Sequence, residues 1–133
     1  MMILGIDHGR AKLGLAKAET PLAEPYRVIE INSQEDALAK VIEEIAKINA
    51  DEIIVGVSEG EIAKEQKNFA ARLKERVKLP VRTWDETLST KDAQLNALSG
   101  GVGRKKRADM EDAFAAAVML QSYLDSQDKQ NLS

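Results

Sequence analysis

The chain alternates between short apolar runs and longer segments in which apolar residues recur every three to four positions. The runs at residues 2–6, 13–18, 26–31, 53–57 and 81–84 have the length and β-branched content of strands. Three of them come first along the chain, and their spacing predicts a meander. The run 53–57 is apolar throughout, which is typical of a strand covered on both faces.

Helical periodicity separates the later strands. Ser33 can cap a helix that runs to Ile48, and a second helical pattern covers residues 61–77. A short helix is predicted from Ser89 or Thr90 to residue 98, and a last amphipathic helix from residue 110 to residue 124. The order βββαβαβαα predicts an α/β protein with a mixed five-stranded sheet, right-handed crossovers and helices on both faces.

Length and composition narrow the class of protein. A chain of 133 residues predicts one domain over residues 1–133, with a polar tail from about residue 126. There is no cysteine and one histidine, His8, which excludes disulfides, thiolate metal sites, a cysteine nucleophile and a multi-histidine metal site. No apolar run is long enough to span a membrane and the N-terminus has no basic region, so we expect a cytoplasmic protein without membrane contact.

The net charge of −3 conceals local basic regions. Residues 61–82 carry seven Lys and Arg against three Asp and Glu, and the tetrad Arg104-Lys105-Lys106-Arg107 follows a glycine-rich stretch. Such a loop can grip a phosphate backbone or can simply be a solvated loop. Its position just before the last helix favours nucleic-acid contact.

Acidic residues stand at the ends of several predicted elements. Asp7 ends the first strand, Glu86 follows the last strand, and Asp109 and Asp112 open the last helix. Acids at a helix N-terminus are stabilised by the helix dipole, which is a sufficient structural reason for the last pair. Asp7 is different, because a carboxylate in a central apolar strand costs free energy unless it is paired or holds a cation.

The predicted topology brings these acids to one edge of the sheet, because ligands of open α/β sheets gather beyond the carboxyl ends of parallel strands. Asp109 and Asp112 are three residues apart and share a helix face. Several carboxylates together are typical ligands of Mg²⁺ or Mn²⁺, and two such ions could activate water for phosphodiester cleavage.

Four blocks of the sequence resemble the YqgF/RuvX family of ribonuclease H-like proteins, described as Holliday-junction resolvases and as pre-16S ribosomal RNA nucleases. The opening Asp7-x-Gly-x-x-x-x-Gly-x-Ala is similar to the start of that family. Residues 51–57 resemble its fourth strand, residues 80–90 its Pro-Val-x-x-x-Asp-Glu-Arg-Leu signature, and residues 112–124 its closing helix. The blocks occur in the family's order and cover nearly the whole chain.

The resemblance implies a ribonuclease H-like fold and a metal-dependent nuclease site. Asp7, Glu86 and Asp112 match the family's metal-binding acids, and Asp109 is a candidate fourth catalytic acid because an aspartate pair three apart resembles the RuvC-type resolvases. The chain departs from the family at Thr87, where an arginine is usual, and after residue 57, where the family continues with a proline and a longer loop.

Other residues have both a functional and a structural interpretation. Arg10 and Lys12 flank Asp7, where they could bind a phosphate or neutralise the acid. His8 points away from Asp7 because side chains alternate along a strand, and Trp84 fits a half-buried strand position better than a base-stacking role. The turn from residue 9 to residue 14 could present backbone N–H groups to a phosphate or be a plain hairpin.

The sequence therefore predicts a Mg²⁺- or Mn²⁺-dependent nuclease acting on branched DNA or precursor rRNA, as a monomer or homodimer. The alternative is a nucleic-acid- or ribosome-associated module with the same fold and weak catalysis. A phosphotransferase of the actin-like class shares the Asp-x-Gly opening, but the chain is too short for its two lobes.

Overall fold

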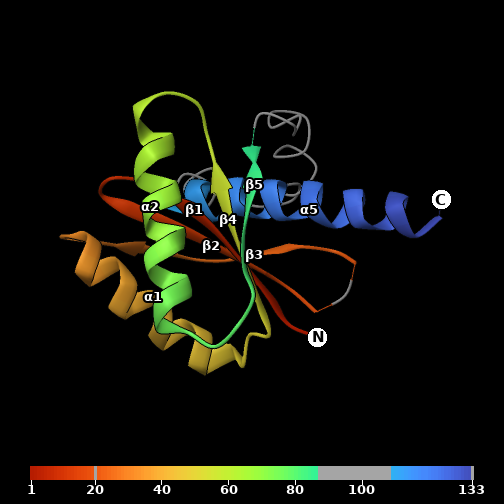
Figure 1. Cartoon of the computed structure of the whole chain (residues 1–133), viewed down its shortest axis with the longest axis horizontal. Helices are drawn as coiled ribbons and strands as arrows, with labels where there is room; N and C mark the ends of the chain where they lie inside the picture. The colour runs from red at the N-terminus through yellow and green to blue at the C-terminus, as the bar shows by residue number, and fades with distance from the viewer. Residues whose placement is uncertain (20, 87–108, 133) are drawn as a thin grey trace.

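The computed structural model describes residues 1–19, 21–86 and 109–132, with side chains described as far as residue 127. Its central element is a five-stranded mixed sheet in the order β3-β2-β1-β4-β5 (Figure 1). The strands are β1 (Ile3–His8), β2 (Lys12–Ala18), β3 (Glu24–Glu30), β4 (Glu52–Val57) and β5 (Val81–Asp85). The helices are α1 (Gln34–Ile48), α2 (Glu61–Arg76) and α5 (Glu111–Leu132).

The predicted strand directions are confirmed. The first three strands form an antiparallel meander, while β4 lies parallel to both β1 and β5. β1 is therefore the central strand, as expected from its apolar sequence. The short helix predicted between residues 89 and 98 lies outside the described residues.

Alternation along the strands divides the core into two layers. On one face, Leu4, Leu13 and Val55 belong to the cluster that packs under α1 and α2. On the other face, Ala16 and Ile54 pack against α5, which crosses the sheet in Figure 1. Helices on both faces are thus confirmed. No helix among the described residues is long and apolar enough to cross a membrane.

Helix boundaries follow local chemistry. Ser33 caps α1 as predicted, because its Oγ accepts a hydrogen bond of 3.0 Å from the N–H of Asp36. The helix ends at Asn49, which adopts a left-handed conformation with φ 54°. α5 continues to Leu132 instead of stopping near Leu124, because its polar final segment contains no glycine or proline to end it.

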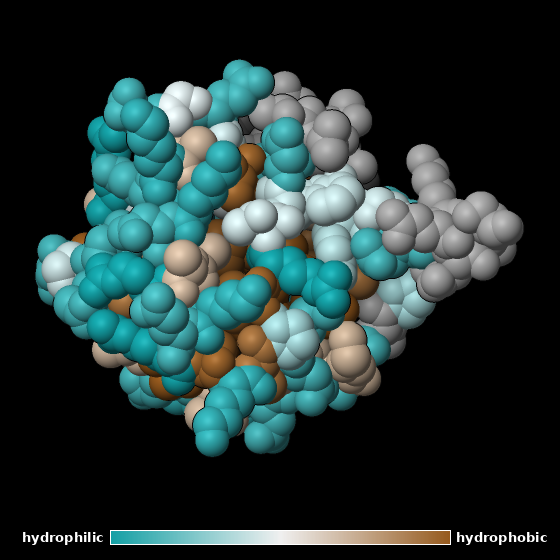
Figure 2. All heavy atoms as spheres, in the orientation of Figure 1, coloured by the Kyte–Doolittle hydropathy of each residue, from teal (hydrophilic) through white to brown (hydrophobic). Residues whose placement is uncertain are grey.

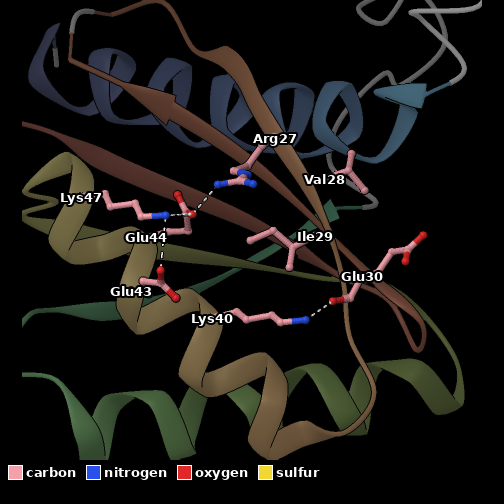
Figure 3. A pocket seen from close by; sticks show the side chains of 8 residues that line it. All are labelled: Arg27, Val28, Ile29, Glu30, Lys40, Glu43, Glu44 and Lys47. Carbon is pink, nitrogen blue, oxygen red and sulfur yellow. Dashed lines mark hydrogen bonds and ion pairs between the residues drawn. The ribbon is translucent and has the colours of Figure 1, made fainter.

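A charged network joins α1 to the edge strand β3 (Figure 3). Glu44 is 3% exposed; its carboxylate accepts hydrogen bonds from the Tyr26 hydroxyl at 2.6 Å and from Arg27 at 2.7 Å, with Lys47 at 3.4 Å. Burial works against ionisation, but these donors together lower the pKa of Glu44. The hollow beside it, of about 370 Å³, is lined by three basic and three acidic side chains.

Candidate active site

The candidate site begins with Asp7 on the central strand. Asp7 lies opposite Gly14 of β2, so both residues face the same side of the sheet. Gly5, two residues earlier on that side, lies under the Leu120 side chain of α5. Asp7 therefore points to the face that α5 covers, at the carboxyl end of β1.

Gly14 brings the start of α5 onto this face. A Cβ atom at Gly14 would collide with the carbonyl oxygen of Asp112 and lie 2.9 Å from the backbone N of Ala113. The backbone of α5 thus rests directly on β2, and the missing side chain of Gly14 makes this close approach possible. Because Gly14 is the partner of Asp7, the half-buried Asp112, in the first turn of α5, lies beside the Asp7 position.

Gly56 makes room for Glu86 on the other side of Asp7. The parallel register pairs Ile6 with Val55, so continuing it by one residue places Asp7 beside Gly56. A Cβ atom at Gly56 would collide with the Glu86 carboxylate, whose Cγ would be 2.9 Å away. Asp7 therefore lies between two glycines, about one strand spacing of 4.8 Å from each, and these glycines make room for Asp112 and Glu86.

Two residues that the sequence reasoning missed hold Glu86. Its carboxylate is buried, and Oε2 accepts a hydrogen bond of 2.8 Å from the Ser58 hydroxyl. Gln66 of α2 in turn accepts from the Ser58 N–H at 2.7 Å and donates to the His8 carbonyl at 3.1 Å. Gln66 is a polar residue on the buried face of α2, and a buried amide must be hydrogen-bonded, so its position was the available signal.

The four predicted acids reach this edge to different degrees. The backbone of Asp112 and the carboxylate of Glu86 lie against the two glycines that flank Asp7, and Asp109 is exposed one turn before Asp112. Within the described ranges, no three His, Asp or Glu side chains are arranged to hold a metal ion together. Carboxylates are the donors that a hard divalent cation prefers, and binding one would require these side chains to turn toward each other.

The residues predicted to bind phosphate do not lie together in the structure. Arg10 is exposed and pairs with Glu65 of α2 at 3.3 Å, so it lies toward the α2 side. Lys12 is exposed and shares the face of Gly14 and Asp7 by strand alternation. Gly9 donates its N–H to the Lys12 carbonyl at 2.9 Å, which uses that group for a plain hairpin turn. The tetrad 104–107 and Thr87 lie outside the described residues.

His8 and Trp84 occupy the structural positions predicted for them. His8 points away from Asp7, donates a hydrogen bond from Nε2 to Oε1 of Gln34 at 3.2 Å and packs on Phe69 with ring centroids 4.6 Å apart. Burial lowers the pKa of His8, which favours the neutral form of the ring. Trp84 is half-buried, lies edge-on to Tyr123 of α5 at 5.6 Å and donates to Ser122 at 3.2 Å.

The sheet order, its helix layers and the acids at its carboxyl edge define a ribonuclease H-like protein. Among solved structures, the chain is similar to Thermus thermophilus RuvC in complex with a Holliday junction substrate (TM-score 0.63, 19% identity, 96% of each chain). It is also similar to the fowlpox virus Holliday junction resolvase (TM-score 0.65, 13% identity, 96% of this chain and 99% of that one). At these identities the likeness shows the fold.

Sequence comparison places the chain more narrowly. The chain belongs to the RuvX family, whose model is described as Holliday junction resolvase and matches residues 1–126. Several similar proteins bear the name "Putative pre-16S rRNA nuclease". One, from Geobacillus kaustophilus, is 38% identical over 95% of this chain and 99% of its own length. Another, from Protochlamydia amoebophila, is 33% identical over 93% of each.

Proposed function

We propose that this protein is a divalent-metal-dependent endonuclease that hydrolyses phosphodiester bonds of structured nucleic acid. The observation that carries the proposal is the packing of Asp112 on Gly14 and of Glu86 on Gly56, with Asp7 between them. Any side chain at positions 14 and 56 would occupy the space of these contacts. Family membership supports a nuclease, and the names of the relatives support branched DNA or precursor rRNA as substrate.

The chain's own residues supply negative charge and position at this edge. Asp7, Glu86 and Asp112 would hold Mg²⁺ or Mn²⁺, with Asp109 as a further ligand from the same helix face. When bound, such ions supply activation of water and stabilisation of the leaving oxygen. Ser58 fixes one Glu86 oxygen by its hydrogen bond, and Lys12 provides a cation on the same face for the substrate phosphate.

The experiment compares wild-type protein with Asp7→Asn on a four-way junction, a plain duplex and a structured 16S rRNA precursor. We expect cleavage of a structured substrate only with Mg²⁺ or Mn²⁺, and its loss in Asp7→Asn without loss of folding. Unchanged cleavage by nuclease-free Asp7→Asn would refute the catalytic role of this acid.

A binding module with weak catalysis is the second candidate. The described side chains form no ready three-ligand metal site, which favours this reading. A binding module predicts that wild-type protein binds a structured substrate tightly and cleaves none of the three substrates when metal ions are added.

A further inference from the structure

The exposed surface of α2 is divided into two differently charged sides. Helical geometry of about 100° per residue places Lys64, Lys67 and Lys74 within an arc of about 80°. We call these three residues the lysine row. All three side chains are exposed, and none makes a hydrogen bond or ion pair with a described residue.

The other side of α2 is neutralised by its neighbours. Arg72 and Arg76 lie about 140° around the helix from the centre of the lysine row. Both donate to Glu35 of α1, and Glu65 on the same side accepts from Arg10. The basic side chains toward α1 are therefore already paired, whereas the lysine row faces away from α1 and keeps its charge for another partner.

The lysine row begins beside the candidate active site. Lys67 lines a hollow of about 290 Å³ together with Ser58, Trp84 and Asp85, at the carboxyl ends of β4 and β5. From there α2 runs back along the sheet (Figure 1), and mostly hydrophilic residues cover this part of the molecule (Figure 2). At 1.5 Å per residue the row extends over about 15 Å, the length of about four base pairs.

We infer that the lysine row binds the sugar–phosphate backbone of a nucleic-acid arm that extends from the candidate active site along α2. The inference rests on the proposed function and adds the surface that holds the substrate's flank. Exposed lysines without partners release counterions when they meet phosphates, and this favours a polyanion over any neutral ligand. The row contacts backbone and not bases, so it confers affinity without sequence preference.

The test measures binding by fluorescence anisotropy in EDTA, which separates binding from cleavage. The double variant Lys67→Gln/Lys74→Gln removes two charges from the row, and Arg72→Gln/Arg76→Gln removes two charges from the opposite side of the same helix. We expect the row variant to lower the log–log salt slope for duplex substrates by about 1.8, because each phosphate contact contributes about 0.9. The matched control keeps the wild-type slope.

Arm length provides a second measurement. The defect of the row variant should grow with arm length until the arm spans the row, at about four base pairs, and stay constant for longer arms. Equal defects in the row and control variants, or a defect independent of arm length, would overturn the inference in favour of net charge alone. Equal row-dependent binding of poly-glutamate would overturn the assignment to nucleic acid.

Failure of the proposed function gives a different result. A wild-type protein that cleaves nothing but shows the row-dependent salt slope would refute the nuclease and keep the lysine row. A protein that cleaves structured substrate with the same slope in all variants would keep the nuclease and refute the row. Wild-type protein that binds no nucleic acid would refute both.

Discussion

Gly14→Ala tests the close approach of α5 to β2 that places Asp112 beside Asp7. The added Cβ would lie 2.9 Å from the backbone N of Ala113 and nearer still to the carbonyl of Asp112, whereas ordinary contacts begin at 3.4 Å. Because the Asp112 carbonyl oxygen is the nearest atom, the start of α5 must move outward by about 1 Å or more. Because the clashing atoms are backbone, no side-chain rotation can relieve the contact.

The expected effects on stability and activity differ in size. Overpacking of this kind costs about 1–3 kcal/mol, which corresponds to a loss of ~4–12 °C in Tm for a domain of this length. Cleavage should fall by about 10- to 100-fold in kcat, because a displacement approaching 1 Å at a reacting group can cost on the order of 100-fold. Thermal unfolding followed by circular dichroism and single-turnover cleavage measure the two effects.

Leu120→Ala is the control for stability. Leu120 is fully buried on α5 over Gly5, so its truncation costs about 2–5 kcal/mol without touching the Gly14 contact. Both variants are assayed at a temperature at which circular dichroism shows each to be folded. The reasoning is refuted if Gly14→Ala cleaves at the wild-type rate, or if Leu120→Ala loses as much activity.

Three further predictions address single interactions. Ser58→Ala removes the hydrogen bond to Glu86. We therefore expect a higher Mg²⁺ concentration for half-maximal cleavage and weaker Mn²⁺ binding by calorimetry, whereas Ser58→Thr should stay near wild type. Equal values in all three proteins would contradict this role of Ser58. Glu44→Gln should destabilise the protein by about 1.5–3 kcal/mol near pH 7. The pKa of Glu44 is lowered on folding, so the stability that its carboxylate contributes is present above the ordinary pKa of 4.5 and is lost as pH falls through the folded pKa. Urea unfolding from pH 7 to pH 3 should therefore show the stabilities of wild type and Glu44→Gln converging. A constant difference in stability would contradict this. Replacing Arg104-Lys105-Lys106-Arg107 by alanine should weaken nucleic-acid binding and flatten its salt dependence by about 0.7–0.9 per lost phosphate contact, and an unchanged slope would identify a solvated loop.

Sequence periodicity was sufficient for the sheet and its layers. The unbroken apolar run at residues 53–57 required a strand covered on both faces, and helical spacing in the segments around it required parallel crossovers. The opposite orientations of Asp7 and His8 followed from strand alternation alone, and Ser33 was a recognisable helix cap. These features depend on neighbours in sequence, so the amino-acid order determines them.

The candidate site depended on contacts that the sequence does not encode locally. Gly56 and Gly14 look like ordinary strand glycines until Glu86 and the start of α5 are seen to occupy the space of their missing side chains. Gln66 links β1, β4 and α2 across 58 residues of chain, and Arg10 pairs with α2 instead of remaining beside Asp7. Sequence patterns give the residue types and the face each one takes; only packing between distant elements decides which of them meet.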